Sequence, residues 1–184
     1  MKRLRLLKQV LNIANPPSSD RLTHPIAVKE HTTMMLPLTP TRTSAQATKL
    51  DAANALKTLR GFIGDSQLRV IGDGCRGEER QYFFDKLVEM ADIVTRMPKT
   101  YETNGQGDNA LAYLHYFSSN CDWFITEKDE DSDGEGQIQA FGLADLGYGG
   151  ELGYISIAEL ITLNVELDLH FTPSTLAQIK ARQN

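Results

Sequence analysis

Apolar residues in the first half of the chain recur at intervals of three and four, which predicts two amphipathic helices. The first is expected over residues 44–63, capped by the serine at its first position. The second is expected over residues 78–97, where Pro98 would end it. Between them, the apolar run 68–71 is short enough to be a strand, and residues 72–77 would then form a turn.

The second half of the chain is instead rich in aromatic and β-branched residues, in short runs separated by turn-forming residues. This pattern predicts strands at residues 110–117, 123–128, 138–146, 152–155 and 167–171. Ser156 is expected to cap a helix over 157–163, with Glu159 completing a capping box, and a closing helix is expected over 173–182. Strands that follow one another directly favour antiparallel pairing. The predicted fold class is therefore α+β, a small antiparallel sheet with helices packed on one face.

Residues 1–42 differ in composition and are expected to be a basic leader followed by a flexible, proline-rich linker. Leucines at helical spacing near the start predict a short amphipathic helix that stops at Pro16. Five of the seven prolines lie between positions 16 and 40. The remaining residues 43–184 are expected to form a single α+β domain, with a helical part at 43–100 and a sheet-rich part at 108–180.

The charge of the chain is divided unevenly between these regions. Residues 1–60 hold ten Lys and Arg against three Asp and Glu, a net of +7, whereas residues 61–184 hold nine against twenty-one, a net of −12. The basic leader offers phosphates only a weak, salt-sensitive attraction, because aromatic residues do not alternate with its charges. The acidic body would repel nucleic acid and is better suited to a basic protein surface.

The lengths of the apolar runs and the cysteine content narrow the cellular location of the protein. No stretch approaches the ~18–20 apolar residues that cross a bilayer, so no membrane association is predicted. Cys75 and Cys121 are the only cysteines and do not form a disulfide framework. A reducing compartment follows, and the expected location is cytoplasmic.

An acidic run begins at Asp129 and reproduces the first half of a calcium-binding EF-hand loop. Its acidic residues stand at positions one, three and five, and Gly134 stands at position six. Position twelve should supply a bidentate glutamate, but Ala140 stands there, and the flanking residues are predicted strands rather than helices. A solvated hairpin loop is therefore favoured, and no metal site is predicted.

The spacing Gly72-x-Gly74-x-x-Gly77 resembles a dinucleotide-binding fingerprint, with Asp92 twenty residues after its first glycine. Acidic residues inside the loop and at the start of the next helix would repel a pyrophosphate, so no cofactor is predicted. The cysteines and histidines lack the paired spacing of a zinc site. A nucleophile built on Cys121 has no local sequence signature.

Four blocks in the second half carry a family resemblance. They are Trp123-Phe-Ile-Thr-Glu127-Lys-Asp129, Phe141-Gly-Leu-Ala-Asp-Leu-Gly147, Glu151-Leu-Gly-Tyr-Ile-Ser-Ile-Ala-Glu-Leu160 and Leu167-Asp-Leu-His-Phe-Thr-Pro173. Over about residues 108–180 the chain resembles the domain-of-unknown-function family numbered 2958. The resemblance implies an association with bacterial plasmids, integrative elements and phages, so the expected cytoplasm is that of a bacterial host cell. It implies no established reaction, cofactor or catalytic residue.

These observations favour a non-catalytic accessory protein of a mobile genetic element that binds a protein target with a basic surface. Inhibition of a host defence system, as by an anti-CRISPR or antirestriction protein, is the sharpest form of this hypothesis. The expected partner-binding residues are Asp129, Asp131, Asp133, Glu135, Trp123, Glu127 and Tyr154. Polar residues beside the buried aromatics, such as Glu127 and Tyr154, are favoured as a satisfied hydrogen-bond network over a site.

Two other functions stay open. The first is a DNA-associated plasmid or phage maintenance or transfer factor, which would contact nucleic acid through Lys2, Arg3, Arg5 and Lys8 of the leader. The second is an unrecognised enzyme that uses Glu127, Glu151 or Cys121. The catalytic residues of such an enzyme, and the oligomeric state, are not indicated by the sequence.

Overall fold

The first helix, α2, spans Lys49–Leu59 and begins at a capping box. The hydroxyl of Thr48 accepts a hydrogen bond from the backbone N–H of Asp51 at 3.2 Å, and the Asp51 carboxylate accepts one from the N–H of Thr48 at 2.9 Å. This computed structural model describes residues 11–12, 46–130 and 136–183, so the predicted cap at Ser44 lies outside the described residues. Thr48 is the cap within them, and the helix ends four residues before the predicted end.

The predicted strand at residues 68–71 is wrong, because this segment lies in helix α3, Asp65–Gly74. Ile71 is buried and Leu68 packs beside it against the core, whereas Val70 is 67% exposed. That spacing of three is helical, and a run of four apolar residues was too short to distinguish the two periods. The turn predicted at 72–77 is therefore also wrong in its first half, since the helix continues to Gly74.

Helix α4, Arg80–Arg96, confirms the second predicted helix, and its Phe83 lies against Gly74 at the end of α3. A Cβ atom on Gly74 would lie 2.2 Å from the ring of Phe83, so only glycine permits this approach. Gly72 and Gly74 thus belong to the last turn of a helix. The strand-to-helix loop that a dinucleotide fingerprint requires is not formed by these residues.

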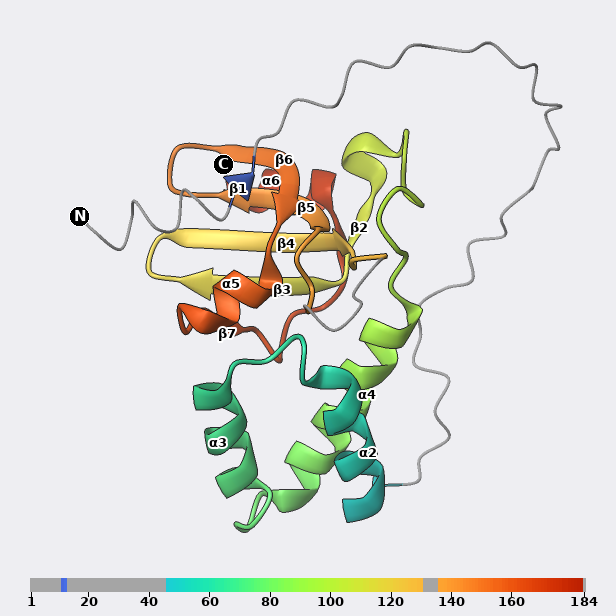
Figure 1. The fold of residues 1–184 in the computed structure, drawn as a ribbon, viewed down its shortest axis with the longest axis vertical. Coiled ribbons are helices and arrows are strands. Elements are labelled where there is room, and N and C mark those ends of the chain that lie inside the picture. The colour runs from blue at the N-terminus through green and yellow to red at the C-terminus, as the bar shows by residue number, and fades with distance from the viewer. Residues whose placement is uncertain (1–10, 13–45, 131–135, 184) are drawn as a thin grey trace, which may run out of the picture. The chain divides into compact units, whose positions relative to one another are not determined.

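Short strands β3 (Leu114–Ser118), β4 (Cys121–Glu127), β5 (Ala140–Asp145) and β6 (Gly150–Ile155) form an antiparallel meander. Helix α5, Ile157–Thr162, then carries the chain to β7, Glu166–Leu167, which pairs with β3 at the far edge. With β1, Leu11–Asn12, beside β6, the strand order is β1-β6-β5-β4-β3-β7 (Figure 1). The predicted α+β class with an antiparallel sheet is confirmed.

The start of α5 follows the prediction in part. The Ser156 hydroxyl accepts a hydrogen bond from the backbone N–H of Glu159 at 3.2 Å, as expected of the cap. The last predicted strand is shorter than expected: β7 stops at Leu167, and His170 lies in an exposed turn.

One face of the sheet and the helices enclose the main core. Sheet residues that include Leu114, Tyr116, Trp123 and Ile125 are fully buried against α2, α4 and α5. The Tyr116 hydroxyl donates a hydrogen bond of 2.7 Å to the backbone carbonyl of Phe62, which satisfies the one polar group of that ring. This layer therefore agrees with the prediction that helices pack on one face of the sheet.

The opposite face carries a second, smaller core. Phe124 and Leu143 point to this side and pack with Leu176 and Ile179 of helix α6, Leu176–Gln183. A two-stranded ladder of β2, Leu111–Ala112, and β8, Ser174–Thr175, lies beside this helix. A 3₁₀ turn, Gly107–Asn109, precedes the ladder. Because β4 is covered on both faces, almost every residue along it is buried.

A β-bulge interrupts the pairing of β4 with β5. Ile125 pairs with Gly142, and Glu127 pairs with Phe141, so Thr126 is the extra residue. In a regular strand Glu127 would pair with Ala140, which is completely buried in the main core, the one covered by α2, α4 and α5. We call this the helix-covered core. The bulge therefore moves the Glu127 side chain to the face that carries Phe141.

The described part of the leader is extended. Leu11–Asn12 form strand β1, which pairs with Tyr154 and Ile155 of β6. The helix predicted near the N-terminus is wrong for these two residues, because the open edge of β6 satisfies their backbone groups and a short isolated helix is marginal in water. Residues 14–45 and the other leader positions lie outside the described residues. None of the helices formed by the described residues combines the length and the apolar composition that a membrane span requires.

The bulge depends on the absence of a side chain at Gly142. A Cβ atom there would lie 2.1 Å from the carbonyl oxygen of Phe124 and 3.0 Å from the Cα of Ile125. We therefore expect Gly142→Ala to lower the free energy of unfolding by about 1–3 kcal/mol or more, because the two strands must separate. Urea unfolding followed by circular dichroism measures this change.

Gly72→Ala is the matched control, since nothing lies within 4 Å of the added methyl group. In helix α3 this change should stabilise the protein by about 0.5–1 kcal/mol. Equal effects of the two substitutions would show that the close approach at Gly142 does not limit stability.

Candidate functional site

A cavity of about 360 Å³ lies where the bulge, the loop after α4 and strand β6 meet. Its walls include Tyr101, Thr103, Glu127, Phe141, Leu152 and Tyr154. The volume falls near the lower end of the range of about 300–1,000 Å³ that is usual for ligand sites. Because its lining comes from segments far apart in sequence, only the folded sheet assembles it.

The loop after α4 is held along the end of β4 by backbone hydrogen bonds. Pro98 ends the helix, and its carbonyl accepts from the N–H of Lys128 at 2.9 Å, while the N–H of Thr100 donates to the carbonyl of Lys128 at 2.9 Å. The Lys128 ammonium donates to the carbonyls of Val94 and Thr95 at the C-terminal end of α4, at 2.9 and 3.1 Å. Burial, and then the nearby Lys99, lowers the pKa of Lys128, and Glu102 opposes this shift.

Glu127 is the acidic side chain of the cavity, and it is only 3% exposed. Its carboxylate accepts hydrogen bonds from the N–H of Tyr101 at 2.8 Å and the N–H of Thr103 at 2.6 Å, and a short one from the Thr103 hydroxyl. All three donors are neutral groups of one turn. The satisfied network that the sequence favoured at this residue is present, and it fixes the loop onto the sheet.

Tyr101 adopts a left-handed backbone conformation, with φ of 78°. This conformation is costly for a residue with a bulky side chain and persists only where surrounding contacts impose it. Here the carboxylate of Glu127 holds the N–H of this residue. The turn leaves the Tyr101 ring 55% exposed at the edge of the cavity.

The Tyr101 ring contacts Tyr154 on β6. Their ring centroids are 6.4 Å apart with an interplanar angle of 69°, an edge-to-face contact. Phe141 also contacts Tyr154, with ring centroids 5.6 Å apart at an interplanar angle of 74°. A side-chain hydrogen bond with Tyr101, followed by burial and the charge of Glu127, raises the pKa of Tyr154 to about 12.

The other residues predicted to bind a partner are dispersed. Trp123 is completely buried, so in this structure it belongs to the helix-covered core. Asp129 is 9% exposed, and its carboxylate accepts from the backbone N–H groups of Ile138 and Gln139 at 2.9 and 2.8 Å, which closes the β4–β5 connection. The following positions lie outside the described residues: Asp131, Asp133, Glu135, Lys2, Arg3, Arg5 and Lys8.

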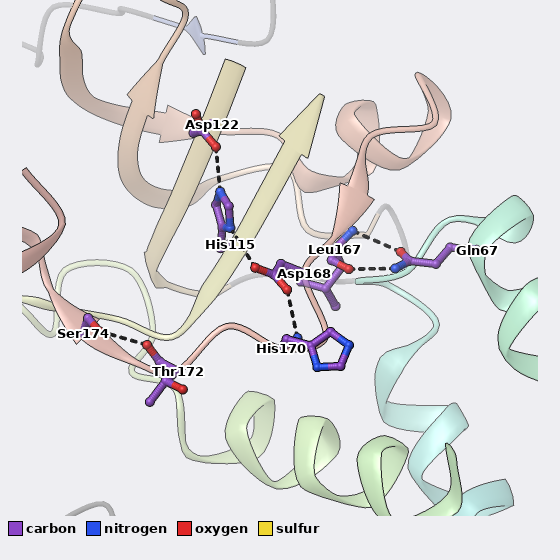
Figure 2. A network of polar contacts seen from close by, with 8 residues as sticks. All are labelled: Gln67, His115, Asp122, Leu167, Asp168, His170, Thr172 and Ser174. Carbon is purple, nitrogen blue, oxygen red and sulfur yellow. Dashed lines mark hydrogen bonds and ion pairs between the residues drawn. The ribbon is translucent and has the colours of Figure 1, made fainter. Parts of the chain in front are cut away.

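A second polar cluster lies on the same face, around His115 of β3 (Figure 2). Its ring nitrogens contact two carboxylates, Asp122 on β4 at 2.8 Å and Asp168 after β7 at 3.2 Å. An ionised carboxylate can only accept, so each contact is a hydrogen bond when the ring nitrogen beside it carries hydrogen. The imidazole also stacks on Phe124, with centroids 4.5 Å apart at 7°.

The His115 cluster has a structural task. Asp168 also accepts from the backbone N–H of His170 at 2.8 Å, and Gln67 of α3 bonds both the N–H and the carbonyl of Leu167, at 3.0 and 2.7 Å. These contacts join the sheet, the segment after β7 and helix α3. His115 is therefore a hydrogen-bonded residue within the fold.

The geometry gives little support to the alternative that the protein is an enzyme that uses Cys121 or Glu151. Burial, and then the charges of Asp122 and Asp145, raises the pKa of the Cys121 thiol, which opposes formation of a nucleophilic thiolate. Glu151 is exposed on β6. Among the described residues, no group of three or more His, Cys, Asp or Glu side chains is arranged to hold a metal ion.

Sequence reasoning missed Tyr101 and Thr103. Their role depends on a left-handed turn and on a bulge in a distant strand, and neither has a local signature. The glycines at 105 and 107, both with positive φ, marked only that a loop was present. The bulge itself could have been suspected from Gly142, because an isolated glycine in a strand often marks one.

Glu127→Gln should lower the free energy of unfolding by about 1–3 kcal/mol. An amide can accept on one side only, so its NH₂ group would face either the Tyr101 or the Thr103 donors. Hydrogen exchange at the amides of Tyr101 and Thr103 should then accelerate. Glu151→Gln on the exposed edge is the control and should change stability by less than about 0.5 kcal/mol. Unchanged exchange at both amides would contradict the anchoring role.

Tyr101→Phe should bring the pKa of Tyr154 from about 12 back towards its usual value near 10. A raised folded-state pKa stabilises the protein below the unfolded pKa near 10, and this contribution is lost as the pH rises towards 12. The ring-carbon chemical shifts of labelled tyrosine, followed against pH, measure the change. Tyr82→Phe, at an exposed position of α4, should leave the Tyr154 titration unaltered. An unchanged pKa of Tyr154 in the Tyr101→Phe variant would refute the coupling between the two tyrosines.

Comparison with known proteins adds one finding. A search of curated proteins and a search of solved structures gave no match. A family model, described as "Protein of unknown function (DUF2958)", matches residues 87–179. The match starts inside α4, earlier than the resemblance at residues 108–180, and it includes every residue that lines the cavity. Because it spans just over half of the 184 residues, the chain belongs to the DUF2958 family.

Proposed function

We propose that this protein is a non-catalytic accessory of a mobile genetic element that binds a basic segment of a partner protein at the cavity beside Glu127. The observation that carries the proposal is the cavity itself. It combines a concave shape with exposed apolar side chains at its edge, Tyr101 at 55% and Leu152 at 45% exposed. Aromatic and aliphatic side chains around a preformed hollow are typical of binding anchors.

The basic character of the partner follows from charge. Residues 61–184 carry a net charge of −12, and Glu127 brings a carboxylate to the cavity. Complementary charge speeds association and excludes wrong partners. An acidic ligand or a nucleic acid would be repelled by the same groups.

The rigidity of the site supports binding. The loop that carries Tyr101 is fixed by the Glu127 carboxylate and by the backbone bonds along Lys128, so the edge of the cavity is preorganised. Preorganised side chains lose little conformational entropy when a partner binds. The family resemblance supplies the setting, a plasmid, integrative element or phage. The target in such a setting is a host protein, with a defence effector as the sharpest case.

The test uses one residue at the cavity edge and one matched residue elsewhere. A photo-cross-linking amino acid at Leu152 identifies the partner in the host cell, and calorimetry with the purified partner measures affinity. Leu152→Gln should weaken binding about tenfold or more, since a buried leucine contributes about 1.5–3 kcal/mol. Leu50→Gln is the control, because Leu50 is 70% exposed on α2, and it should leave affinity unchanged.

The salt dependence of partner binding and the retention of DNA distinguish the proposed protein-binding function from the DNA-associated alternative. Binding to a basic segment should weaken as salt rises, because screening shortens the range of the attraction. Equal affinities of the Leu152 and Leu50 variants would refute the proposed surface. Retention of duplex DNA at physiological salt that is lost when Lys2, Arg3, Arg5 and Lys8 are replaced would favour the DNA-associated alternative.

A further inference from the structure

Three aromatic rings meet at one corner of the cavity. Tyr154 stands between Tyr101 and Phe141 and makes an edge-to-face contact with each, at interplanar angles of 69° and 74°. The three rings therefore differ in orientation, and all three line the cavity. The face of an aromatic ring carries negative potential and attracts a cation within about 6 Å of its centroid.

The same cavity holds a negative charge that is hydrogen-bonded but not neutralised by its donors. Glu127 is the one acidic or basic side chain among the described residues that line it. Its three donors are two backbone N–H groups and one hydroxyl. The neighbouring Lys128 ammonium is directed to carbonyls of α4 instead.

A carboxylate offers about four acceptor positions, so a further donor can still be accommodated at Glu127. A buried charge is costly unless an opposite charge accompanies it. An apolar occupant of the cavity would desolvate Glu127 without compensation, and an anion would be repelled. A cationic group would gain both from the carboxylate and from the ring faces.

We propose that the cavity is an aromatic cage that receives the cationic head of a lysine or arginine side chain. The head contacts the faces of Tyr101 and Tyr154 while Glu127 supplies the countercharge, and Leu152 packs on the aliphatic stem. This assignment rests on the proposed function, because the side chain belongs to the basic segment of the partner. It adds which group of that segment is recognised.

The first measurement needs no partner. Lysine with both backbone termini capped, and arginine capped in the same way, are titrated into the full chain, and the ring resonances of Tyr101 and Tyr154 are followed by NMR. Saturable shifts are expected with a dissociation constant on the order of millimolar, as suits so small a ligand. ε-Acetyl-lysine keeps the stem but lacks the charge, and it should bind at least fivefold more weakly. Equal binding of the acetylated form, or no binding of either cation, would overturn the proposal.

The second measurement uses the ring of Tyr101, which is exposed enough for substitution without loss of the fold. Tyr101→Leu should weaken binding of the capped cation about fivefold or more, whereas Tyr101→Phe should retain it, because the ring face and not the hydroxyl makes the contact. Tyr82→Leu on α4 is the matched control and should bind as the unchanged protein does. Similar losses with Tyr101→Phe and Tyr101→Leu would contradict a cation held by the ring.

The two proposals fail in different ways. If Leu152→Gln abolishes partner binding while the capped cations do not bind, the surface binds a protein without a cation in the cavity, and the cage is refuted alone. If the capped cations bind but neither Leu152→Gln nor Tyr101→Leu changes partner affinity, the cage stands as a cation site and the proposed partner surface is refuted.

Discussion

One backbone irregularity determines the candidate site, the bulge at Thr126 in the central strand. It changes the register by one residue and so turns Glu127 away from the helix-covered core. A carboxylate in that core would stand beside Ala140 without the donors that it now has. On the other face it meets the N–H groups of a turn and imposes the strained conformation of Tyr101. Loop position, cavity and aromatic corner all follow from this change.

The two faces of the sheet are stabilised by different means. The helix-covered face is apolar and closed, with Trp123 and Tyr116 fully buried in it. The other face combines a small apolar cluster around Phe124 with two polar groups, His115 between its carboxylates and Glu127 under its loop. Hydrogen-bonded polar groups specify one arrangement more strictly than apolar contacts do, because their bonds require particular directions and partners. This face is therefore the one where a precisely positioned binding surface can be built.

Both polar groups secure segments that the sheet alone would leave loose. The His115 cluster fixes the chain after β7, and Glu127 fixes the chain after α4. They differ in what surrounds them. The His115 ring contacts Phe117, Phe124 and Phe171, whereas Glu127 lines a cavity with the exposed ring of Tyr101 at its edge. The difference in surroundings, rather than in residue chemistry, makes one a support and the other a candidate binding group.

The sequence by itself determined the α+β class, helix α4, the β-meander and the family, because these depend on local periodicity and on short motifs. It placed Glu127 and Tyr154 among the candidate residues without indicating that they share a cavity. The tertiary structure decided that residues 68–71 are helical, because Ile71 packs on the core while Gly74 admits Phe83. It also decided that Tyr101 meets Glu127. That contact joins residues distant in sequence through a bulge, and no local pattern encodes a register shift between two strands.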